Sequence, residues 1–203
     1  MAIITPQIED RLRALYEAPG RHHHGWGHIL HMRGLAMLHA KLITHLDALL
    51  VMIVFHDAIY DSRRKDNEKR SSDLARAMLT GLVPEDTTDM ICAGIEATEK
   101  HLVPEGLPET WRRDIAFLLD FDLAIIGADE KEFDLFDHNV RLEYDWVDDE
   151  AWRVGRAEVM RSFARRSSIY FTKEFREEFE VQARNNITRL SHRLESQGEI
   201  RDQ

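Results

Sequence analysis

The sequence lacks the features that would place it outside the cell or inside a bilayer. Cys92 is its only cysteine, so no internal disulfide can form, and a reducing compartment is expected. A membrane-spanning helix needs about 20 apolar residues in succession, and the apolar stretch 46–55 is too short for one. We therefore expect a cytoplasmic protein that does not insert into a membrane.

Positive charge is also scarce. The chain has 27 Lys and Arg against 37 Asp and Glu, which gives a formal net charge of -10. Nonspecific binding of duplex nucleic acid depends on basic side chains that neutralise phosphates, so we expect no such partner. A small phosphorylated substrate held by a few local cations stays compatible with this charge. A homodimer is left open.

Proline and glycine are few, and they fall between segments in which apolar residues recur at helical spacing. This pattern predicts one all-α domain over 1–203, with C-terminal helices over about 130–195 that pack on the core. The β-branched residues of segment 49–55 leave an α/β alternative open, in which 49–55 and 117–121 are strands. We expect helices over 6–16, 29–39, 46–60, 67–79, 85–101, 111–126, 133–146, 150–166 and 172–195.

A His-Asp pair ends the most apolar segment of the chain. His56 and Asp57 follow the run 49–55, and a charge buried there requires a compensating partner or a metal ion. His24 and His28 are spaced to share one face of a helix, and Asp122 stands inside another apolar segment. Imidazole and carboxylate together suit divalent transition metals, so these residues are candidates for one metal site.

These residues resemble the HD-domain superfamily of metal-dependent phosphohydrolases, in which a His, a His-Asp pair and a distant Asp bind one metal. The resemblance is closer still to a small bacterial branch of predicted HD phosphohydrolases. It covers most of the chain from Arg21 to Asn186. The stretches that carry it are 21–24 with 28–29, 55–61, 67–71, 98–101, 119–127, 141–144, 155–156 and 169–170.

The resemblance implies an HD-type helical bundle that binds one divalent metal ion: Mn, Ni, Co, Fe, Zn or Mg. The implied ligands are His28, His56, Asp57 and Asp122. His24 matches a histidine that protonates the leaving group in related cyclic-nucleotide phosphodiesterases. The implied activity is hydrolysis of a small phosphate mono- or diester, with a nucleotide as one candidate.

Further residues receive roles in substrate binding or in water activation. Glu68 is a candidate to orient or deprotonate water. His101 falls near an extra histidine of two-metal HD proteins, which have two, so the single one here favours one metal. Guanidinium binds phosphate bidentately, which makes Arg21, Arg141 and Arg156 candidate phosphate clamps.

Structural readings of the same residues stay open. Asp120 competes with Asp122 for one ligand role, and Glu68 suits the first turn of a helix. His101 suits a helix C-terminus, and Arg141 and Arg156 suit an ion-pair network. At the level of function, a catalytically silent module that binds a metal or nucleotide is the alternative. A metal buffer built on the histidines of 22–28 is another, although it leaves Asp57 and Asp122 unexplained.

Overall fold

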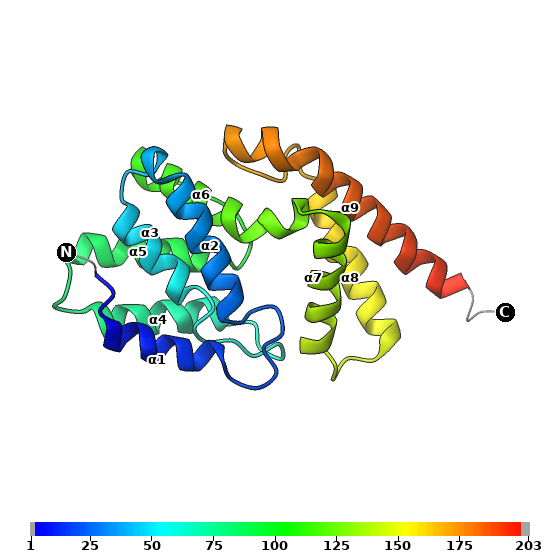
Figure 1. The fold of residues 1–203 in the computed structure, drawn as a ribbon, viewed down its shortest axis with the longest axis horizontal. Helices are drawn as coiled ribbons and strands as arrows, with labels where there is room; N and C mark the ends of the chain where they lie inside the picture. Colours follow the sequence, from blue (N-terminus) through cyan, green and yellow to red (C-terminus); the bar gives the residue numbers. More distant parts are fainter. Residues whose placement is uncertain (1–2, 200–203) are drawn as a thin grey trace. The chain divides into compact units, whose positions relative to one another are not determined.

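The computed structural model describes residues 3–199, and their regular structure is helical throughout: nine α-helices and two short 3-10 helices, with no strand in that part of the chain (Figure 1). The expected all-α fold is confirmed. The α/β alternative is wrong for the described residues, because segments 49–55 and 117–121 both lie within helices. The chain divides into two compact units, Met1–Asp122 and Leu123–Gln203.

The first unit contains the helices that hold the candidate site. Thr5 caps the first helix, because its hydroxyl oxygen accepts a hydrogen bond from the backbone N–H of Ile8 at 3.3 Å. The elements of this unit are α1 (Pro6–Tyr16), α2 (Trp26–Leu38), η1 (Ala40–Leu42), α3 (Leu46–Phe55), α4 (Asn67–Leu79), α5 (Glu85–Ala97) and α6 (Glu109–Leu123), whose last residue already belongs to the second unit.

Helix α3 forms the centre of this unit. It packs against α1, α2, α4 and α5, and its side chains from Val51 to Phe55 are all buried. The close approach of α5 is made at Gly94, where a Cβ would clash with the sulfur of Met52. Because a helix buried on all sides is apolar all round, its sequence shows no amphipathic period. The helix ends at Phe55 rather than continuing to residue 60 as expected.

The second unit consists of η2 (Ala124–Gly127), α7 (Glu130–Glu143), α8 (Asp149–Ala164) and α9 (Lys173–Glu199). Helix α9 binds η2 through the buried side chain of Asn186, which donates hydrogen bonds to the carbonyls of Ile126 and Ala128, both at 2.9 Å. The expected single domain, with C-terminal helices packing on the core, stays a prediction. The boundary between the two compact units lies a few residues before position 130.

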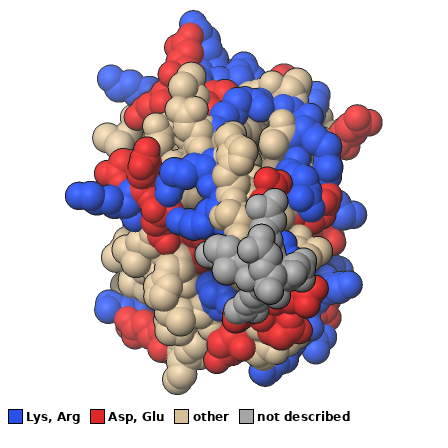
Figure 2. Space-filling view, turned by 90° about the vertical axis from the view of Figure 1, so that its right-hand side faces the viewer, with Lys and Arg blue, Asp and Glu red and all other residues tan. Residues whose placement is uncertain are grey.

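Acidic and basic side chains alternate on the face of the molecule drawn in Figure 2. In the second unit Arg189 and Arg193 both form ion pairs with Asp134, and Arg184 pairs with Glu180. These three arginines are thus neutralised locally. None of the helices in the described part of the chain combines the length and apolar character that crossing a bilayer demands.

Candidate metal centre

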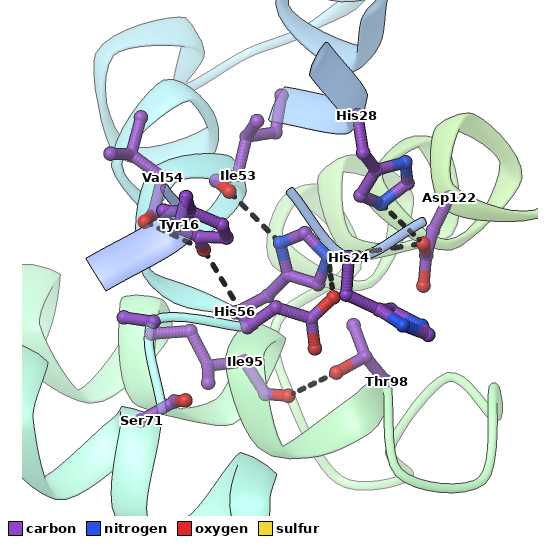
Figure 3. A network of polar contacts seen from close by, with 12 residues as sticks. Tyr16, His24, His28, Ile53, Val54, His56, Ser71, Ile95, Thr98 and Asp122 are labelled. Carbon is purple, nitrogen blue, oxygen red and sulfur yellow. Dashed lines mark hydrogen bonds and ion pairs between the residues drawn. The ribbon is translucent and has the colours of Figure 1, made fainter. Parts of the chain in front are cut away.

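Three helix ends bring together two imidazoles and a carboxylate (Figure 3). His28 lies in the first turn of α2, His56 directly follows α3, and Asp122 is the next-to-last residue of α6. Asp122 Oδ1 is 3.1 Å from His28 Nε2 and 3.8 Å from His56 Nε2, and one ligand atom from each residue lies within 4.8 Å of the others. Ligand atoms about 2.1 Å from one ion are about 3.0–4.2 Å apart, so the spacing fits a shared cation.

The Nε2 atoms of the two imidazoles lack hydrogen-bond partners among the described residues. His28 Nε2 and His56 Nε2 are buried and have no hydrogen-bond partner within the described structure, although carboxylate oxygens of Asp122 and Asp57 lie 3.1 and 3.0 Å from them. A buried polar atom without a partner is destabilising unless something else satisfies it. A metal ion bound beside the carboxylate would satisfy both nitrogens.

The end of α3 sets the orientation of His56. The last carbonyls of a helix have no intrahelical partner, and the Nδ1–H of His56 donates to one of them, the carbonyl of Ile53, at 2.9 Å. This hydrogen bond fixes the tautomer of the neutral ring and leaves Nε2 as the nitrogen with a free lone pair. The local fold therefore points the ligating atom of His56 toward His28 and Asp122.

Asp57, the fourth expected ligand, lies beside this group. Its Oδ2 is 3.0 Å from His56 Nε2, and its backbone N–H donates to the hydroxyl of Tyr16 at 3.2 Å. The tightest cluster of ligand atoms contains His28, His56 and Asp122 without it. Asp57 as a direct ligand stays a prediction, and its distance from His56 is compatible with that role.

The cluster is electrostatically coupled. Burial is the largest single influence on the pKa of His56 and lowers it, but Asp57, Asp122 and the carbonyl of Ile53 together outweigh burial and raise that pKa to about 9. Burial likewise opposes ionisation of Asp57, and the neighbouring His56 still holds the pKa of its carboxyl well below the usual range. The pKa of Asp122 is also lowered, because His101, His28 and His56 together outweigh its burial. Without a metal, the ring of His56 is thus protonated near neutral pH.

His101 holds the far oxygen of Asp122. Its Nε2 lies 2.9 Å from Asp122 Oδ2, while Oδ1 faces the two metal-site histidines. His101 has a left-handed backbone with φ 48°, in a turn beyond α5, so the helix expected to reach residue 101 ends at Ala97 instead. Outer partners of this kind orient a ligating carboxylate. A role in substrate binding stays a prediction.

The two residues expected to move protons lie close to the cluster. The imidazole of His24 stacks on Tyr60 with ring centroids 4.3 Å apart and is near enough for its charge to lower the pKa of Asp57. Glu68 is in the first turn of α4, and its pKa is raised, chiefly by burial and further by the charges of Asp57 and Glu99. Both placements are compatible with the predicted catalytic roles.

The three arginines expected to clamp phosphate bind other groups of the protein. Arg21 donates to backbone carbonyls beside the site. Arg141 donates to the carbonyls of Tyr144 and Val147 and pairs with Asp149, which closes the turn between α7 and α8.

Arg156 is 8% exposed and forms an ion pair with Asp137 at 2.8 Å, in agreement with the structural reading of this residue. Its Nη2 is buried without a hydrogen bond in the described structure. The phosphate-binding roles of Arg141 and Arg156 stay predictions.

Several residues that support the site carried no assigned role in the sequence. The amide of Asn67 pairs with both backbone groups of Asp61, and the hydroxyl of Ser71 contacts the N–H and the carbonyl of Ile59. Together they anchor the loop after the His-Asp pair onto α4. The only available signal was that both are polar residues inside segments that resemble the family; their partners are backbone atoms, which leave no trace in sequence spacing.

Comparisons of the chain with protein-family models, with curated proteins and with solved structures found no match.

Proposed function

We propose that this protein is a metal-dependent phosphohydrolase of the HD type, acting on a small phosphate mono- or diester, with nucleotides as one candidate class. The observation that carries the proposal is the pair of buried Nε2 atoms of His28 and His56, which lack a hydrogen bond in the described structure and face the carboxylate of Asp122. The resemblance of the sequence to HD phosphohydrolases supports the same reading.

The residues around the cluster supply the other parts of a hydrolytic reaction. A bound divalent ion would lower the pKa of a water molecule from 15.7 to about 7. Glu68 would accept the proton of that water as its oxygen bonds to phosphorus, and His24 would donate a proton to the ester oxygen as the P–O bond breaks. The products are an alcohol and a phosphate group, so atoms and charge balance without a further reactant.

The test begins with protein freed of metal and reloaded separately with Mn, Ni, Co, Fe, Zn and Mg. Each form is assayed for bound metal and for phosphate release from a panel of mono- and diesters that includes nucleotides. We expect one ion per chain and turnover with at least one ion. Asp122→Asn should abolish both, because an amide cannot supply the charge that the cation requires. Asp73→Asn, at an exposed carboxylate on α4, is the matched control and should change neither.

The possible outcomes separate the alternatives. One tightly bound ion with no turnover on any ester would favour the silent binding module. Weak binding of several ions that survives Asp122→Asn would favour the histidine metal buffer. If the wild-type chain binds no divalent ion, the proposed function is wrong.

A further inference from the structure

One guanidinium group connects the two halves of the candidate site. Arg21 lies in the loop between α1 and α2. Its Nη1 donates to the carbonyl of His24 at 3.0 Å and to the carbonyl of Asp57 at 2.6 Å, and its Nη2 donates to the carbonyl of Ala58 at 2.9 Å. These hydrogen bonds join the main chain of the expected general acid to the main chain of an expected metal ligand.

Two tyrosines hold this guanidinium in place. It lies 4.9 Å from the ring centre of Tyr16 and 5.5 Å from that of Tyr60, which are cation–π distances. Tyr16 is buried, and its hydroxyl donates to the carbonyl of Val54 and accepts from the N–H of Asp57. Tyr60 in turn stacks on the imidazole of His24. The position of Arg21 is therefore set from three sides.

We propose that Arg21 is a positioning residue: its forked hydrogen bonds fix the loop bearing His24 against the turn bearing Asp57, so that the two histidine-containing segments are preorganised for one cation. This inference rests on the proposed function. It is an alternative to the phosphate clamp expected for Arg21, which stays a prediction, and it is suggested by the three carbonyls to which the guanidinium already donates. An ammonium group cannot reproduce this arrangement, since it lacks the planar fork.

The two roles predict different changes in Arg21→Ala and Arg21→Lys. Loss of an outer partner of a metal site weakens metal binding by about 10–100-fold. A positioning residue should show that loss in both variants, with an altered visible spectrum of bound Co²⁺, a lower kcat and little change in KM. A phosphate clamp should instead raise KM, keep the metal affinity and the Co²⁺ spectrum, and be partly restored by lysine.

Arg33→Ala is the matched control. Arg33 forms a forked ion pair with Glu9 that ties α2 to α1, so it is also an arginine linking two elements. Its removal should leave metal affinity and the Co²⁺ spectrum unchanged. Circular dichroism of each metal-free variant checks that it is folded. If neither Arg21 variant folds, Arg21→Gln replaces them, because its amide can donate to a carbonyl but lacks the guanidinium fork.

Metal affinity is measured by titration calorimetry with Co²⁺ alone, independently of turnover. Wild-type protein that binds no ion would contradict the proposed function. If the wild type binds Co²⁺ and a folded Arg21 variant shows the same affinity and spectrum, the positioning role is overturned and the metal site is left intact.

Discussion

The two nitrogens of the His56 imidazole have different roles. Nδ1 caps the end of α3 through the carbonyl of Ile53, and Nε2 faces Asp57 and Asp122. The carboxylates that would help to hold a cation also favour a proton on this ring when no cation is present. Proton and metal therefore compete for the same nitrogen.

This competition predicts a pH-dependent metal affinity. The pKa of His56 in the metal-free protein is about 9, so near neutral pH a bound ion must displace its proton. We expect affinity to rise about tenfold per pH unit up to about pH 9 and then to level off. Calorimetry in two buffers of different ionisation enthalpy should show about one proton released per ion. Binding near neutral pH without proton release would contradict this prediction.

The same shift sets the sign of a stability effect in the metal-free protein. Because the folded pKa of His56 lies above its ordinary 6.5, its contribution to stability is fully present below pH 6.5 and is lost as the pH rises to about 9. Asp57→Asn removes the stronger of the two carboxylates that raise this pKa. The alkaline loss of stability should then shift toward lower pH.

The sequence could identify those residues whose role follows from the chemistry of their own side chains. His28, His56 and Asp122 were expected as ligands from residue type and order, and the structure brings them together. Arg21 was expected to bind phosphate, because an arginine near a metal motif has that obvious use. Its observed partners are backbone carbonyls, and no pattern of side chains reveals which carbonyls a loop leaves unpaired.

At the scale of helices, the existence of each α-helix was predictable, but some of the ends and the two 3-10 helices were not. The starts after Thr5 and at Asn67 agree with expectation, because a capping or turn residue marks each one. The ends at Phe55 and Ala97 are wrong in the prediction by about four to five residues, since no Gly or Pro marks them. At Phe55, polar side chains of the site bond the last carbonyls of the helix. The His56 ring donates to the carbonyl of Ile53, and the Tyr16 hydroxyl donates to that of Val54.

Two glycines give opposite predictions for replacement by alanine. At Gly127 in η2, a Cβ would lie 2.6 Å from Phe179 Cβ and 2.7 Å from the Tyr170 hydroxyl. Overpacking of this kind destabilises by about 1–3 kcal/mol. At Gly155, on the exposed side of α8, a Cβ would contact nothing within 4 Å, so alanine should stabilise by about 0.5–1 kcal/mol through helix propensity.

Urea unfolding of Gly127→Ala and Gly155→Ala measures both effects. Because both glycines belong to the second unit, the comparison is internal to it. Equal changes in the two variants would show that the close packing of η2 against α9 does not limit stability.

At the scale of the whole molecule, the division of the chain bears on how a bound ion would act. Every residue expected to ligate the metal belongs to Met1–Asp122, and the last of them, Asp122, ends that unit. Sequence could not place this boundary, because α6 runs from Glu109 to Leu123 without a linker or a change in composition. In a single domain over 1–203, a bound ion would stabilise the whole chain. In two units that open separately, it would stabilise only the unit that binds it.

Hydrogen exchange distinguishes these two cases. An ion at 100 times its Kd stabilises the folded state that binds it by about 2.7 kcal/mol. If the units open separately, slower exchange should be confined to the first unit, including the ligand-bearing ends of α2, α3 and α6, and the amides of α8 should exchange at an unchanged rate. The measurement compares metal-free and Co²⁺-loaded protein by mass spectrometry, with Asp122→Asn as the control that should show no slowing anywhere. Equal slowing in α8 would contradict separate opening and support a single cooperative domain.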